Sequence, residues 1–115
     1  MNLGSNSLTG KIITRIGTIV TGATITPSAT SDDQYNVTAL AENAIIAAPS
    51  GIATDGQSLR LRFKATGDRT LTWNGIYRQI KTLPNLAHNG KVLYVGLVYN
   101  TQDTKWDCIA VAEET

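Results

Sequence analysis

The residues that could carry chemistry in this 115-residue chain are few and stand apart from one another. Catalysis by a nucleophile needs a base held beside it, and the only histidine, His88, lies in a turn sequence that contains glycine. Carboxylate pairs occur at Asp32-Asp33 and Glu113-Glu114, but adjacent residues of a strand point to opposite faces, and those of a turn face water. We therefore predict that the protein is not an enzyme and has no catalytic residues.

Metal and cofactor sites are not indicated either. Aspartates in predicted turns could offer oxygen ligands to calcium, but none has a recognised ligand spacing, and Asp is common in turns because it hydrogen-bonds its own backbone. The single cysteine, Cys108, excludes an internal disulfide and a multi-cysteine zinc site, and its apolar neighbours predict a core side chain. We expect no metal, cofactor or small-molecule substrate. The turn aspartates are Asp32, Asp33, Asp55, Asp68 and Asp103.

Charge and hydropathy narrow the range of partners. Ten basic and nine acidic residues are scattered along the chain and give a net charge of +1, which does not indicate electrostatic capture of nucleic acid. The first residues show neither the basic nor the apolar region of a signal peptide, and no apolar run is long enough to cross a bilayer. We expect a soluble protein, made in a cytoplasm, that contacts neither nucleic acid nor membrane.

The chain divides into a short arm and a single domain. Residues 1–10 are rich in Asn, Ser and Gly and have only Leu3 and Leu8 to bury, so we expect an extended arm or a flexible lead, which is ordered only if a partner or a neighbouring subunit holds it. β-branched residues follow from Lys11 and favour strands over helix. Residues 11–115 are enough to bury the core of one domain.

Turn residues punctuate this domain at short intervals. About eight short strands are expected between clusters of Gly, Pro, Asn and Asp, which predicts an antiparallel β-sandwich or barrel. Residues 44–47 are expected to form one of these strands. Thr66-Gly67-Asp68 is expected to connect a hairpin, and Asn74-Gly75 is typical of a type I′ hairpin turn.

The clearest expected strand is 57–65. Apolar and basic residues alternate strictly along it, so one face points inward and the other outward. A basic row of this kind could contact an acidic partner, although such a row is more often simply solvated. The inward residues are Leu59, Leu61 and Phe63, and the outward ones are Arg60, Arg62 and Lys64.

The strand expected over 91–99 is apolar on both of its alternating faces. Such a strand must be covered on both sides, and in a chain this short the second cover could be another copy of the protein. The pattern alone does not distinguish a subunit interface from an enclosed core strand. One face carries Leu93, Val95, Leu97 and Tyr99, and the other carries Val92, Tyr94 and Val98.

The tryptophans leave two further roles open. Trp73 and Trp106 could form a platform that stacks on sugar rings. They could also belong to the core or to a subunit interface, which is the more common role of such residues.

A series of segments shares its order and spacing with one group of proteins. The segments are DQYNVTAL at 33–40, IAAPSG at 46–51, LTWNGIYR at 71–78, LYVGLVYN at 93–100 and KWD at 105–107. Together they resemble a β module of tailed-bacteriophage virion proteins, over roughly residues 24–113. The chain departs from this pattern in its own loop at 79–89 and at Cys108, where an aliphatic residue is more usual.

The resemblance implies a virion structural protein. The small size, without a coiled-coil stalk or fibre shaft, fits a capsid decoration (cement) protein, whose relatives are often jelly-roll-like and trimeric. Such a protein would bind the outer surface of the phage head, bridge subunits of the major capsid protein, and be made in the host bacterial cytoplasm. The alternative is a receptor- or carbohydrate-binding module of a tail or head fibre, which would expose Trp73, Tyr77 or Trp106.

Site residues follow from the decoration role. We expect the arm residues Leu3 and Leu8 to contact the capsid, and the basic row of strand 57–65 to make polar contacts with a partner. The contacts between copies in a homotrimer are expected at Tyr94, Val98 and Trp106.

Overall fold

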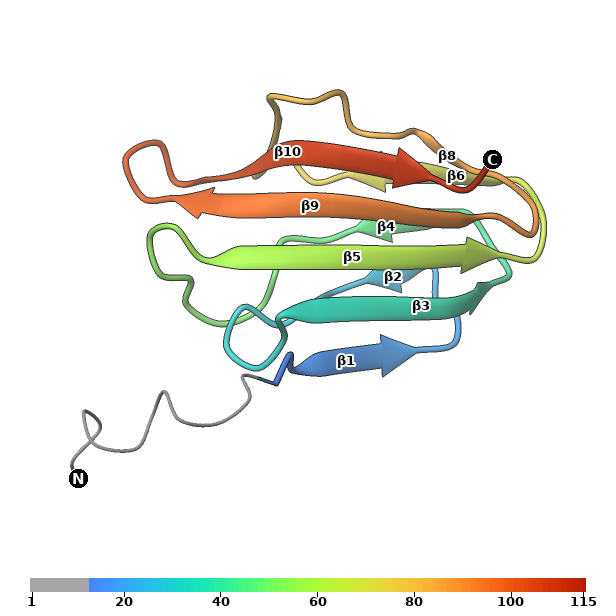
Figure 1. Cartoon of the computed structure of the whole chain (residues 1–115), viewed down its shortest axis with the longest axis horizontal. Coiled ribbons are helices and arrows are strands. Elements are labelled where there is room, and N and C mark those ends of the chain that lie inside the picture. The colour runs from blue at the N-terminus through green and yellow to red at the C-terminus, as the bar shows by residue number, and fades with distance from the viewer. Residues whose placement is uncertain (1–12) are drawn as a thin grey trace.

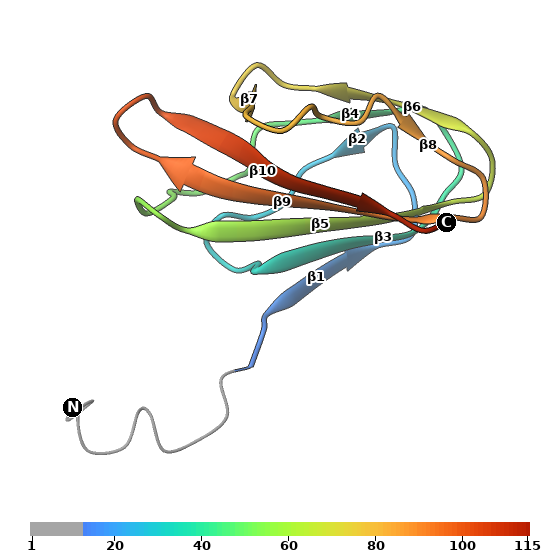
Figure 2. The ribbon, with the colours of Figure 1, turned by 45° about the horizontal axis from the view of Figure 1, so that its top comes forward.

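The protein is all-β. A computed structural model describes residues 13–115, and within them the chain forms ten strands in two sheets and no helix (Figure 1). The arm residues Leu3 and Leu8 lie outside the described residues. The two sheets face each other as two layers, which Figure 2 shows more nearly from the side.

The larger sheet has six strands in the order β1-β3-β5-β9-β10-β7, and the smaller has four in the order β2-β4-β6-β8. The strands of the large sheet are β1 (Ile16–Ile19), β3 (Gln34–Leu40), β5 (Ser58–Ala65), β7 (Tyr77–Gln79), β9 (Val92–Asn100) and β10 (Lys105–Glu113). Those of the small sheet are β2 (Thr24–Ile25), β4 (Ala44–Ile46), β6 (Arg69–Trp73) and β8 (Leu86–Ala87). The strand expected over residues 44–47 is thus confirmed as β4.

The chain crosses from one sheet to the other after every strand from β1 to β8. A strand of the large sheet is followed by one of the small sheet, so the next strand of the large sheet starts again from the same end. This path makes β1, β3 and β5 parallel to one another, and likewise β2, β4 and β6. The expectation of antiparallel sheets is therefore wrong for five of the eight pairings, and antiparallel pairs occur only at β5–β9, β9–β10 and β6–β8.

The same path corrects two predicted hairpins. Thr66-Gly67-Asp68 leads from β5 to β6, and Asn74-Gly75 leads from β6 to β7, and each pair of strands lies in opposite sheets. β5 already has β3 and β9 as neighbours, so β6 has no place beside it. At the second turn the Asn74 side-chain oxygen accepts a hydrogen bond from the backbone N–H of Ile76 at 2.9 Å, and Gly75 does not take the positive φ that a type I′ turn requires.

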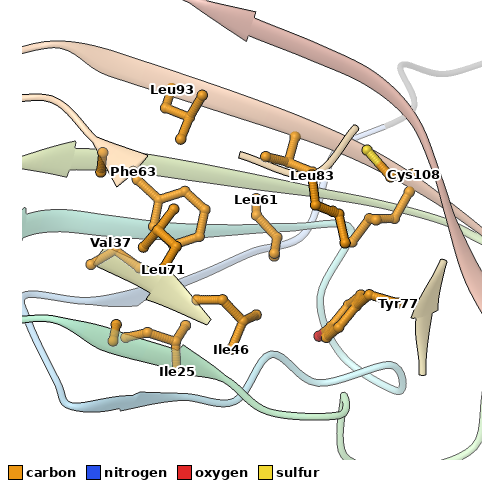
Figure 3. Close-up of a cluster of buried hydrophobic side chains, with 14 of the residues drawn as sticks. Ile25, Val37, Ile46, Leu61, Phe63, Leu71, Tyr77, Leu83, Leu93 and Cys108 are labelled. Carbon is orange, nitrogen blue, oxygen red and sulfur yellow. The ribbon is translucent and has the colours of Figure 1, made fainter. Parts of the chain in front are cut away.

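The core lies between the two sheets (Figure 3). The alternation predicted for β5 is confirmed, because Leu59, Leu61 and Phe63 are fully buried and the basic residues between them face outward. Cys108 is also fully buried, as its apolar neighbours predicted. The small sheet and its connections add further apolar side chains, which include Ile25, Ile46, Leu71 and Leu83.

Two glycines in the connection from β4 to β5 allow a matched test of how closely this connection packs against its neighbours. Gly51 and Gly56 have φ values of 79° and 80°, a conformation that costs an L-residue about 1–2 kcal/mol. A Cβ at Gly51 would collide with the Thr30 hydroxyl, whereas one at Gly56 would meet open space. We expect Gly56→Ala to lower the free energy of unfolding by about 1–2 kcal/mol, and Gly51→Ala to lower it by more.

Urea denaturation of both variants measures this difference. Thr30→Ala in the Gly51→Ala background should recover part of the loss, since it removes the clashing hydroxyl. Equal losses in the two glycine variants would mean that the 28–33 turn moves aside without a loss of stability.

Candidate functional site

The candidate catalytic groups are dispersed over the surface and the core. His88 Nδ1 lies 2.8 Å from Glu113 Oε2 in an exposed pair, and Cys108 is enclosed by apolar side chains, which raises the pKa of its thiol by desolvation. Among residues 13–115, no group of three His, Cys, Asp or Glu side chains is arranged to hold a metal ion. The described part of the chain also contains no helix long and apolar enough to span a membrane.

The pair Asp32-Asp33 has a structural role. Asp32 is buried, and its carboxylate accepts a hydrogen bond from the backbone N–H of Ser28 at 2.8 Å. Asp33 accepts two hydrogen bonds from the Arg15 guanidinium, at 2.9 and 3.2 Å, and one from the Arg15 backbone N–H. These bonds to Arg15 lower the pKa of Asp33. Both carboxylates therefore fasten the turn before β3.

The surface with the clearest binding character is the outer face of the large sheet, which is the face directed away from the small sheet. Its half over β9 and β10 is apolar, and we call this the apolar half. Leu93, Val95 and Leu97 of β9 point into the core, so the alternate residues point outward. The apolar half consists of Val92, Tyr94, Gly96, Val98, Ile109, Ala110 and Ala112.

A β-bulge shapes this apolar half. Cys108 pairs with Leu97 and Ala110 pairs with Gly96, so Ile109 is an extra residue of β10. A bulge can re-aim a side chain, and here Ile109 is 55% exposed. Beside it, Gly96 has no side chain to fill the surface, and a shallow hollow of about 260 Å³ lies between Arg60, Val98 and Ile109. A projecting apolar side chain thus lies next to an open apolar hollow.

The basic row of Arg60, Arg62 and Lys64 adjoins the apolar half on β5. Arg60 Nε donates to Gln34 Oε1 of β3 at 2.9 Å. The Arg62 guanidinium lies 5.9 Å from the centre of the Tyr94 ring. Within residues 13–115, none of these three cations has a carboxylate within salt-bridge distance.

Most other arginine charge in the described residues is neutralised. Arg78 of the edge strand β7 binds Asp107 of β10 through Nε, with 2.6 Å to Oδ1, and Asp103 through Nη1, with 2.8 Å to Oδ2. These bonds lower the pKa of Asp107 and raise that of Arg78. The cluster holds β7 against β10, where the two strands run parallel.

The residues predicted to contact another copy separate into two groups. Tyr94 is 39% exposed and Val98 is half-buried, and both lie on the apolar half. Trp106 is 1% exposed and packs against Tyr99 with 5.1 Å between the ring centres. A trimer contact through Trp106 is therefore wrong, because its own chain already encloses the side chain.

The sugar-stacking platform suggested for Trp73 and Trp106 is not formed. Trp73 packs edge-on against Tyr77 and Phe63, and its indole N–H donates to the Pro84 carbonyl at 2.7 Å. Tyr77 is 5% exposed, and its hydroxyl donates to the Ala47 carbonyl at 2.7 Å. These aromatic residues belong to the core and its margin.

Sequence reasoning missed two residues of the surface, Gly96 and Ile109. The alternation after Trp106 and Cys108 would place Ile109 outward, and an isoleucine at an outward position was a usable signal. The bulge itself gave none, because Ile109, Ala110, Val111 and Ala112 are all apolar and fit either register.

Comparisons with known proteins support the fold alone. No protein-family model matches the chain, and no curated protein matches it. A chain in a solved structure described as "Structure of a chaperone-substrate complex" is similar, with a TM-score of 0.53, 11% sequence identity and coverage of 85% of this chain. The match spans only 18% of that chain. The fold and the surface therefore define an all-β protein with one candidate interaction face.

Acidification should test the contact between Arg78 and Asp107. Because the folded state lowers the pKa of Asp107, the stabilisation is complete above the unfolded pKa, which is about 3.9, and is lost as the pH falls through the folded value. We expect Asp107→Asn to destabilise the protein at neutral pH and to have little effect in strong acid. Urea denaturation across this pH range measures the difference, and a loss that is the same at all pH values would contradict it.

Proposed function

We propose that the protein is a structural component of a phage virion that binds its partners by surface complementarity, and specifically that it is a capsid decoration protein. The observation that carries the proposal is the apolar half of the outer face, which the described chain leaves exposed at Tyr94 and Ile109. Exposed apolar surface of this kind is typical of protein interaction sites. The sequence resemblance to virion modules supports the choice of a virion.

In this proposal three copies associate through their apolar halves, with Tyr94 and Val98 as contacts. Each trimer would bridge subunits of the major capsid protein on the outside of the head. Several modest contacts on one particle act together through their high effective concentration and give slow release. Leu3 and Leu8, which lie outside the described residues, are the proposed contacts of the arm with the capsid.

The jelly-roll likeness is part of the same proposal. The two facing sheets, joined by a chain that alternates between them, support it. The parallel pairs of β1–β3–β5 and β2–β4–β6 set this chain apart from an antiparallel jelly roll.

The oligomeric state tests the use of the apolar half. Light scattering of the purified protein should give three times the 12.3 kDa chain mass. Tyr94→Asp combined with Val98→Asp should yield monomers, because two charges would lose water at the contact. Thr72→Asp, on the exposed face of the small sheet, is the control and should leave the mass unchanged. A monomeric unmodified protein at micromolar concentration would contradict the trimer.

The position of the protein in the virion tests the decoration role. A map of virions that contain the protein should show trimeric density on the outside of the head, and heads without it should release DNA at a lower temperature until purified protein is added. Density at the tail tip would overturn the role.

The receptor- or carbohydrate-binding module is the alternative proposal. It would have to use residues other than Tyr77 and Trp106, since both are buried. Binding to host cells or to a glycan array, without occupancy on the head, would favour it.

A further inference from the structure

The basic row has a regular geometry. β5 is the third strand of six, so Arg60, Arg62 and Lys64 stand on a broad sheet and not on its edge. Alternate residues of a strand are about 6.7 Å apart, and the three side chains leave the same face. The row therefore presents three cationic side chains whose points of attachment the backbone spaces regularly.

The neighbours of the row leave its charge uncompensated. Arg60 and Arg62 lie in register with uncharged residues on both sides, and Lys64 with one on β9; such pairs are the main cross-strand interactions of a sheet. Asp33 adjoins Arg60 at the start of β3, but Arg15 already binds its carboxylate. The registered neighbours are Gln34 and Asn36 on β3, and Val92, Tyr94 and Gly96 on β9.

Two of the cations are held in place without being neutralised. The Gln34 side chain accepts from Arg60 Nε and donates to Asn36 Oδ1 at 2.8 Å, so a chain of neutral amides orients the guanidinium. Arg62 is placed by the face of Tyr94. These side chains are therefore partly ordered before a partner binds, which reduces the entropy lost on binding.

The outer face of a second copy cannot supply the matching charges. On the outer face of β10 Asp107 is bound by Arg78, whereas Glu113 is in register with the inward Leu93 and pairs with His88. Glu114 accepts a hydrogen bond from the backbone N–H of Val92 and is a single carboxylate against three cations. Contact between two outer faces would therefore leave the row without matching charges, which favours a different molecule as its partner.

The setting of the row favours a protein over nucleic acid as that partner. Nucleic-acid sites cluster many cations on one face, whereas this row is flanked by amides on one side and by the apolar half on the other. In an extended acidic segment alternate residues are also about 6.7 Å apart. Such a segment can place one carboxylate opposite each cation.

We propose that the basic row of β5 binds an extended acidic segment of a partner protein, with Asp or Glu at alternate positions aligned along the strand. This inference adds a specific contact to the proposed attachment to the virion. It rests on the proposed function only in that the partner is taken to be a neighbouring protein of the virion. The apolar half remains available for the contact between copies.

Titration of the ¹⁵N-labelled protein with a peptide of alternating Glu and Thr tests the inference directly. Amide signals of β5 and of the facing residues of β3 should shift, and the affinity should fall as salt is added, because exposed charges are screened. Lys64→Gln should weaken binding by about two- to fivefold, as expected for one exposed ion pair. Lys81→Gln removes another exposed cation, from a loop outside the row, and should leave the affinity unchanged.

Three results would overturn the proposal. They are equal binding of a Gln-Thr peptide, an equal loss in the Lys64→Gln and Lys81→Gln variants, and the absence of shifts on β5 at millimolar peptide. Tighter binding of single-stranded DNA than of the acidic peptide would assign the row to nucleic acid instead. Because the peptide needs no virion, failure here leaves the decoration role standing, and failure of the virion map leaves the acidic-segment site standing.

Discussion

The structure depends on the burial of one face of each sheet against the other. β5 shows this constraint most clearly, because Leu59, Leu61 and Phe63 must leave water while the residues between them cannot. A strict alternation fixes which side of the strand is inside, since a shift of one residue would bury three cations. The other strands of the large sheet likewise direct one face toward this buried layer.

The crossing of the chain between the two layers follows from the same constraint. Each sheet has one face to bury, and from β1 to β8 the next strand in the sequence lies in the opposite sheet. Repeated crossing builds both layers together and makes β1, β3 and β5 parallel. Only after β8 do two successive strands, β9 and β10, stay in one sheet and pair as a hairpin.

The buried core also explains why the outer face of the large sheet is available to bind a partner. The core is complete inside one chain, so the apolar residues on the opposite side of β9 are not part of it. Two arginines outside the basic row are held in ion pairs, Arg78 with Asp107 and Arg15 with Asp33. The outer face combines uncovered apolar area with unpaired cations, and these two features carry the proposals made for it.

The sequence by itself determined the all-β class, the inward and outward faces of β5, the two apolar faces of β9 and the burial of Cys108. These features follow from the residue types and from the two-residue repeat of a strand, both of which can be read within a few positions of the sequence. The tertiary structure alone decided which strands are neighbours. It decided that Thr66-Gly67-Asp68 and Asn74-Gly75 connect strands of opposite sheets and do not form hairpins, and that Trp106 is buried in the core. It also decided that Ile109 projects beside Gly96. The physical reason is that pairing and burial depend on competition among distant segments, and a turn sequence cannot show that β3 and β9 already occupy both sides of β5.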